Sequence, residues 1–118
     1  MATNPRIPTL ELQIETEKTP AEIIFRCEGK LTSSTAAQFR EPIHEAIMAS
    51  KRVVLDLSKV KNMDSSGLGV LVSLWVSAKR AGCELKLISL SERVRELLHL
   101  TSLDKLFAIS RFPDKPSF

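Results

Sequence analysis

The apolar and polar residues of this chain follow two different periods in turn. Residues 10–15 alternate strictly between apolar and polar side chains, and this period of two predicts a half-buried strand. After a break at Thr19 and Pro20, residues 22–27 predict a second strand. Because the connection between the two is short, the pattern favours an antiparallel hairpin.

A helical period follows, and it contains a proline. Apolar side chains recur every three or four residues over 36–48, after a run of hydroxyl residues, Thr32 to Thr35, that can cap a helix. Pro42 lies inside this pattern, and a proline in a helix interior costs about 3 kcal/mol. We therefore expect either a kink at Pro42 or an irregular first turn that ends before it.

The middle of the chain is the most apolar part. Residues 53–57 (VVLDL) predict a strand that is buried on both faces, as in a parallel sheet, with Asp56 near its end and bonded to the following loop. That loop spans 58–64. Residues 66–81 then predict a helix covered on more than one side, which ends at Gly82.

The last third repeats the strand-then-helix pattern. Residues 83–88 predict a strand, Ser89 with Glu92 predicts a capping box for a third helix, and residues 106–109 predict a short final strand. The order β-β-α-β-α-β-α-β predicts one α/β domain over 10–111, with a mixed, mostly parallel sheet and helices mainly on one face. We expect residues 1–9 to form a flexible lead-in and residues 112–118 a short polar tail.

Composition and charge exclude several classes of protein. A length of 118 residues fits one domain, and 43% apolar residues can build a core. The net charge of +3 is too small for a nucleic-acid footprint. The most apolar run, 68–78, is about half the length of a membrane-spanning helix. The first residues carry no secretion signal, so we expect a cytoplasmic protein without membrane or direct nucleic-acid contact.

The cysteines and histidines offer no metal or cofactor site. Cys27 and Cys83 are far apart in sequence, and we expect buried thiols rather than a disulfide. His44 and His99 are best explained by packing on helices. With so few potential ligands, the usual spacing of a structural zinc site cannot be built, and we expect no cofactor.

The segment with the most chemical information is 62–69 (NMDSSGLG). It lies between the buried strand and the apolar helix, where unpaired backbone N–H groups and the positive end of the helix dipole favour an anion, including a phosphate attached to a serine. The segment lacks the Gly-Lys-Ser/Thr of a phosphate-binding loop and the GxSxG of a nucleophile elbow. A purely structural interpretation stays open, in which Asp64 and the serines cap the helix and the glycines allow close packing.

Three segments of the chain resemble one known family. They are VVLDLSKVKNMDSSGLGVLVSLWVSAKRAG, CELKLISLSERVRELLHLTSLDKLF and FRCEGKLTSSTAAQF, and together they cover about residues 10 to 110. These segments resemble the STAS domain family, and above all its stand-alone bacterial members, the anti-sigma-factor antagonists.

The resemblance implies a regulatory switch rather than an enzyme. In such antagonists an anti-sigma factor serine kinase binds the unphosphorylated protein and phosphorylates the first serine of the DSSG run, which matches Ser65. Phosphorylation releases the antagonist, and a PP2C-type phosphatase resets it. By this resemblance its partner surface comprises Thr32, Asp64, Ser65, Ser66, Gly67 and Leu68. We expect a monomer or weak dimer.

The chain departs from the family pattern at two positions. Thr32 stands where the family usually has an acid on the partner-facing surface, and Ser102 stands where many relatives have a glycine before a leucine. The family also suggests two other roles for such a chain. It could be the binding subunit of a lipid or anion transport complex, or a domain of a stress-sensing scaffold.

Overall fold

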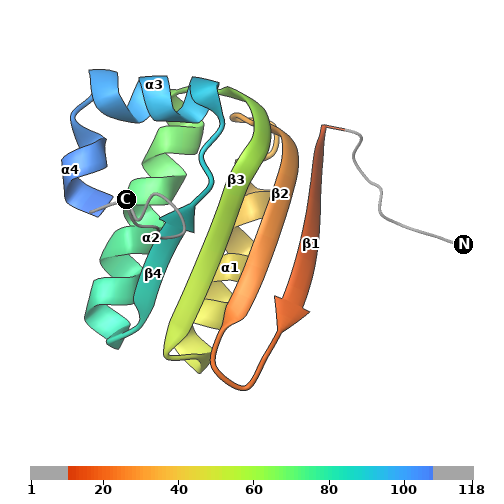
Figure 1. The fold of residues 1–118 in the computed structure, drawn as a ribbon, viewed down its shortest axis with the longest axis vertical. Coiled ribbons are helices and arrows are strands. Elements are labelled where there is room, and N and C mark those ends of the chain that lie inside the picture. The colour runs from red at the N-terminus through yellow and green to blue at the C-terminus, as the bar shows by residue number, and fades with distance from the viewer. Residues whose placement is uncertain (1–10, 108–118) are drawn as a thin grey trace, which may run out of the picture.

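The computed structural model describes residues 11–107, which form a four-stranded mixed sheet with helices packed against it (Figure 1). The strand order is β1-β2-β3-β4; β1 is antiparallel to β2, whereas β2, β3 and β4 are parallel. This confirms the predicted α/β class and mostly parallel sheet. The predicted lead-in 1–9 and tail 112–118 lie outside the described residues.

The first two strands form the expected hairpin. Strands β1 (Leu12–Lys18) and β2 (Ile23–Leu31) pair in register from Leu12 opposite Gly29 to Lys18 opposite Ile23. In the turn, Thr19 Oγ1 accepts hydrogen bonds from the N–H groups of Ala21 and Glu22, which fixes the chain reversal.

Helix α1 (Ala36–Ala49) follows β2 and contains Pro42. It buries Phe39, Ile43 and Ile47 along one face. Because the helix is regular from Ala36, six residues before the proline, the predicted irregular first turn is wrong. The loss of one hydrogen bond at Pro42 is tolerated where the apolar face is held by packing.

Strand β3 (Arg52–Met63) is much longer than predicted. The expected loop over 58–64 is wrong, because residues up to Met63 continue to pair with β2. Val60 and Met63 are buried, so tertiary pairing outweighs the polar residues between them. Asp56 consequently lies in the middle of the strand, where its Oδ1 accepts a hydrogen bond from Ser58 N at 3.0 Å.

Helix α2 (Ser65–Ala81) and strand β4 (Glu84–Ile88) follow as predicted, separated by Gly82 in the left-handed conformation at φ 72°. Helices α1 and α2 lie behind the sheet in Figure 1, whereas α3 (Glu92–Leu100) crosses near the ends of β3 and β4. The helices therefore lie mainly on one face, as expected.

Two predictions near the C-terminus are wrong. Ser91, not Ser89, caps α3 by accepting a hydrogen bond from Val94 N at 3.2 Å, and Ser89 adopts a positive φ of 51°. Residues predicted as a strand from 106 form the end of a helix, α4 (Leu103–Phe107), while 108 and 109 lie outside the described residues. A short apolar run cannot distinguish a strand from a buried helical turn.

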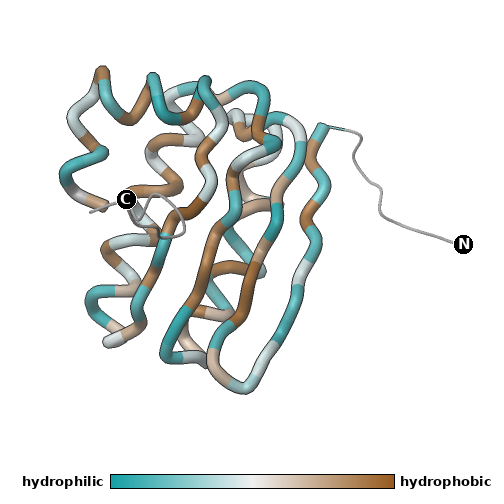
Figure 2. Tube along the Cα trace, viewed as in Figure 1, coloured by the Kyte–Doolittle hydropathy of each residue, from teal (hydrophilic) through white to brown (hydrophobic). Residues whose placement is uncertain are grey.

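The core lies between the sheet and the two helices behind it. Figure 2 shows hydrophobic residues gathered along the middle of the sheet. Its largest fully buried side chains come from every layer and include Phe39, Leu55, Leu57, Leu71, Leu74 and Leu98. Among residues 11–107, no helix has the length and apolar character needed to cross a membrane.

Candidate functional site

The ends of β2 and β3 bring two predicted site segments together. Leu31 and Met63 form the last pair between these parallel strands, so the chain leaves the sheet at Thr32 and at Asp64 on the same edge. The Asp64 N–H donates to the Leu31 carbonyl oxygen at 3.3 Å. This edge, at the top of Figure 1, is the carboxyl end of the parallel strands, where functional groups of open α/β sheets collect.

Asp64 connects both segments through its carboxylate. Oδ1 accepts hydrogen bonds from Ser66 N at 2.9 Å and Gly67 N at 3.1 Å, which makes Asp64 the N-cap of α2. Oδ2 accepts from Ser33 N at 3.3 Å. The predicted capping role is confirmed. The bond to Ser33 adds a tie to the β2–α1 loop.

Ser65 is the first residue of α2, and it is exposed. Its backbone lies at the positive end of the helix dipole, next to the capping Asp64, and the first turn of α2 contains no acid. Ser66 is half-buried. Ser65 therefore offers an accessible hydroxyl where an attached anion is electrostatically tolerated.

Gly67 and Leu68 contribute to packing at this end of the sheet. Gly67 is buried, and a Cβ at this position would clash with the Leu31 carbonyl oxygen. Leu68 is half-buried and packs against the core. Of the six residues predicted for partner binding, Asp64 and Ser65 are exposed and Thr32 is half-buried beside them.

Thr32 belongs to a chain of polar contacts that the sequence did not reveal. Its Oγ1 lies 3.1 Å from Ser34 Oγ, which donates to Glu11 Oε1 at 2.7 Å. Beneath them, the buried Thr35 hydroxyl donates to the Lys30 carbonyl at 2.8 Å. Glu11 thus places a carboxylate near Thr32. Because Glu11 is 23 residues from Ser34, no local pattern could have indicated this contact.

The remaining titratable candidates are two thiols and two imidazoles. Cys27 and Cys83 are free buried thiols, as predicted. Burial raises the pKa of the Cys27 thiol to about 12, with a smaller contribution from the Asp56 carboxylate. His99 is exposed with Nδ1 3.4 Å from Asp104 Oδ2, and His44 is half-buried in α1. Within residues 11–107, no three metal-ligating side chains lie close enough to hold an ion.

Comparison with known sequences identifies one family. The sequence model of the STAS domain matches residues 13–115. The chain is 32% identical over 102 residues to a protein of Paenibacillus polymyxa named anti-sigma F factor antagonist, covering 85% of this chain and 87% of that protein.

Solved structures show the same fold. An anti-sigma factor antagonist from Mycobacterium paratuberculosis superposes with a TM-score of 0.76 at 21% identity, covering 92% of each chain. The phosphorylated form of SpoIIAA, described as a Bacillus cell fate determinant, superposes with a TM-score of 0.65 at 22% identity, covering 79% of this chain and 86% of that one.

Proposed function

The chain belongs to the STAS domain family, and from this premise we propose that it is an anti-sigma factor antagonist switched by phosphorylation of Ser65. The unphosphorylated protein binds an anti-sigma factor serine kinase and so frees a sigma factor for transcription. The observation that carries the proposal is the exposed Ser65 hydroxyl at the start of α2, in a chain similar over most of its length to a protein named anti-sigma F factor antagonist.

The electrostatics of the α2 N-terminus support a phosphate at Ser65. A phosphoserine carries about −1.5 to −2 charges at neutral pH. Asp64 already uses both carboxylate oxygens on three backbone N–H groups, so its charge is partly compensated. Within the free protein the helix dipole favours the new charge. In a docked interface the same charge and bulk would have to be desolvated, which drives release without refolding.

The partner surface in this proposal consists of Thr32, Asp64, Ser65, Ser66, Gly67 and Leu68, extended by Glu11. Glu11 lies one hydroxyl contact beyond Thr32, through Ser34, so its carboxylate supplies negative charge close to the position where the family pattern has an acid. Glu11→Gln should therefore weaken kinase binding. The double variant Glu11→Gln with Thr32→Asp should restore it.

The remaining parts of the proposal follow from the same role. The chain acts as a substrate and switch in the cytoplasm rather than as an enzyme, and a PP2C-type phosphatase returns Ser65 to the free hydroxyl. Its contacts are with proteins rather than with nucleic acid or membrane.

Phosphopeptide mapping tests the proposal directly. After expression in the native host, the intact mass and a peptide map over residues 62–71 should show one phosphate on Ser65. Ser65→Ala should abolish the modification and keep kinase binding, whereas Ser65→Asp should lose binding. Ser66→Ala is the matched control and should still be phosphorylated.

Two results would contradict the proposal. Phosphorylation that persists in Ser65→Ala would place the switch at another residue. An unmodified chain that co-purifies with a transport ATPase subunit, or with very large particles, would favour the transport or scaffold role instead.

A further inference from the structure

The outer side of helix α2 carries a stripe of residues that the site at its N-terminus does not explain. Ser65, Gly69, Val72, Val76 and Lys79 follow one another at spacings of four, three, four and three residues. This heptad spacing places them on one side of the helix. The opposite side carries Gly67, Leu71, Leu74 and Ala78, all buried against the core. We call these five residues the outer stripe.

The outer stripe is apolar in its middle although it faces away from the core. Val76 is 38% exposed, and Val72 is half-buried. Charged side chains begin only at Lys79 and Arg80, in the last turn. Val76 is therefore an exposed apolar side chain on a helix that already buries its other side, a position at which a second helix can pack.

Nothing in residues 11–107 requires a glycine at position 69. It lies inside a regular helix without a positive φ, and a Cβ added there would meet no atom of the described residues within 4 Å. Glycine in a helix interior costs about 1 kcal/mol relative to alanine. Gly67, two residues earlier, is required by the approach of the Leu31 carbonyl. Gly69 instead leaves an open hollow on the helix surface, one turn from Ser65.

The outer stripes of two copies of the chain are complementary when their helices run antiparallel. In an antiparallel pair centred on Val72, the projecting Val76 of one copy meets the hollow at Gly69 of the other, and Val72 meets Val72. The ends are complementary in charge, because Asp64 lies at the start of the helix and Lys79 with Arg80 at its end. A parallel pair would bring like charges together.

We propose that a second copy of this chain docks on the outer stripe of α2 in an antiparallel, two-fold symmetric arrangement. Such an interface is isologous, because both copies use the same surface. The contact between Gly69 of one copy and Val76 of the other is therefore made twice. A helix of 17 residues is about 25 Å long, so the contact is short and the dimer weak and dependent on concentration. The dimer covers Ser65, and only the monomer presents this hydroxyl to other proteins.

Sedimentation of the full chain over a range of concentrations measures the association. The wild type should show a monomer–dimer equilibrium that weakens a few-fold when salt is raised, since charged helix ends contribute. Val76→Glu should raise the dissociation constant at least tenfold, because it brings a charged carboxylate into the apolar middle of the contact. Leu100→Glu is the matched control: Leu100 is 71% exposed on α3, outside the outer stripe, and its substitution should leave association unchanged.

Cross-linking tests the two-fold axis itself. Val72→Cys places a thiol opposite its own copy and should form a disulfide-linked dimer faster than Leu100→Cys under the same mild oxidation. The native thiols do not interfere, since both are buried and their pKa values are raised by burial.

Three outcomes would overturn the proposal. The first is a wild type that stays monomeric at every concentration, and the second is equal association of Val76→Glu and wild type. The third is cross-linking of Val72→Cys no faster than of Leu100→Cys. If the Val76→Glu variant associates like the wild type but its dilute monomer is less stable, the second outcome applies. The outer stripe would then be covered by another part of the same chain. None of these measurements involves a kinase, so they are independent of the function proposed for Ser65.

Discussion

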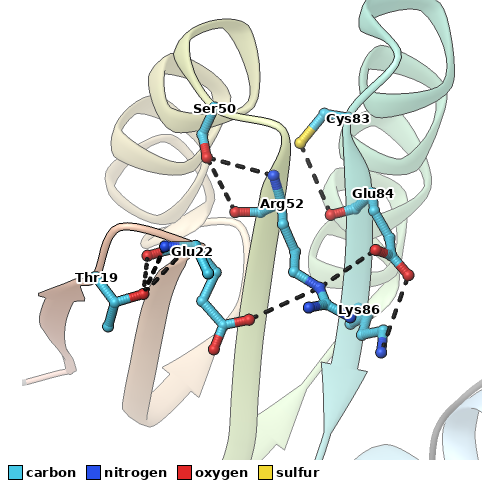
Figure 3. A network of polar contacts seen from close by, with 8 residues as sticks. Thr19, Glu22, Ser50, Arg52, Cys83, Glu84 and Lys86 are labelled. Atoms are coloured by element: carbon cyan, nitrogen blue, oxygen red, sulfur yellow. Dashed lines mark hydrogen bonds and ion pairs between the residues drawn. The ribbon is translucent and has the colours of Figure 1, made fainter.

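At the amino end of the parallel strands, charged side chains bond to one another. Arg52, the first residue of β3, lies between two carboxylates, with Nε 3.2 Å from Glu84 Oε1 and 3.7 Å from Glu22 Oε1 (Figure 3). Lys86 Nζ lies 3.9 Å from the other oxygen of Glu84. Positive and negative groups therefore face each other across β2, β3 and β4.

At the carboxyl end the charged group bonds to the backbone instead. Asp64 accepts from three N–H groups of two segments, and the neighbouring Ser65 hydroxyl remains exposed. At one end of the sheet charged side chains form ion pairs with one another, although the buried Arg52 Nε has no hydrogen-bond partner among the described residues. At the other end a carboxylate bonds to backbone N–H groups beside an exposed hydroxyl. The comparison teaches that the two ends of one sheet can bond their charged groups differently, through partly exposed ion pairs at one end and through backbone N–H groups at the other.

The largest expected effect concerns the glycines at the carboxyl end. Gly67→Ala should lower the free energy of unfolding by about 3 kcal/mol, because the new methyl group clashes with the Leu31 carbonyl. Gly69→Ala is the matched control, since it enters open space in a helix and should raise stability by up to about 1 kcal/mol. Urea unfolding of dilute protein measures both, and equal effects would show that the close approach at Gly67 is unimportant.

The two ends can be compared directly by removing one charge from each. Asp64→Ala should cost about 2 kcal/mol, because the helix cap and the tie to Ser33 are lost together. Arg52→Ala should cost about 0.5 kcal/mol, since its ion pairs are partly exposed and screened by water. Urea unfolding again gives both values, and a larger loss for Arg52→Ala would reverse the comparison.

Between the two ends, the Cys27 thiol should make stability depend on pH. Its pKa rises from an ordinary value near 9 to about 12 in the folded protein, so unfolding releases a proton between these pH values. The contribution of this thiol to the free energy of unfolding should therefore be constant below pH 9 and fall by about 1.4 kcal/mol per pH unit from there to about pH 12.

The Cys27→Ala variant isolates this contribution. It should be less stable than wild type at pH 8, and the difference should shrink by about 1.4 kcal/mol at pH 10, measured by urea unfolding under reducing conditions. A difference that is constant with pH would mean that the thiol ionises freely in the folded protein.

The smallest expected effect separates two serines at the starts of helices. Ser91 Oγ donates to the Val60 carbonyl at 2.7 Å and accepts from Val94 N, so Ser91→Ala should cost about 1 kcal/mol. Ser65→Ala should change stability by less than about 0.5 kcal/mol, because this exposed side chain caps nothing. Thermal unfolding of both variants checks the contrast; equal losses would argue that the Ser65 hydroxyl is structural.

Much of the fold could be predicted because its signals are local. The alternating residues of the hairpin, the apolar period of α1 and α2, and Gly82 at the end of α2 all act within a few residues of one another. The second half of β3 could not be predicted, since residues 58–62, which are polar except for Val60, become a strand only by pairing with β2. Ser102, by contrast, has a positive φ of 62°, a left-handed conformation that favours glycine.

The part of the candidate site that could be predicted also depends on signals that are local in the sequence. Asp64 and Ser65 stand together in sequence, and the capping role of an aspartate before a helix follows from its chemistry. The contacts of Ser33 with Asp64 and of Ser34 with Glu11 span 31 and 23 residues. Such contacts depend on the register of the sheet, which no local spacing defines.

The order of the strands in space is also their order along the chain. During synthesis each new strand therefore finds its neighbour already made: β2 pairs with β1, β3 with β2, and β4 with β3. No strand has to wait for a later one to be inserted beside it, and no unpaired gap persists in the middle of the sheet. The sheet can thus form strand by strand, starting from β1, during translation. This order limits the time for which apolar strands stay unpaired and prone to aggregation.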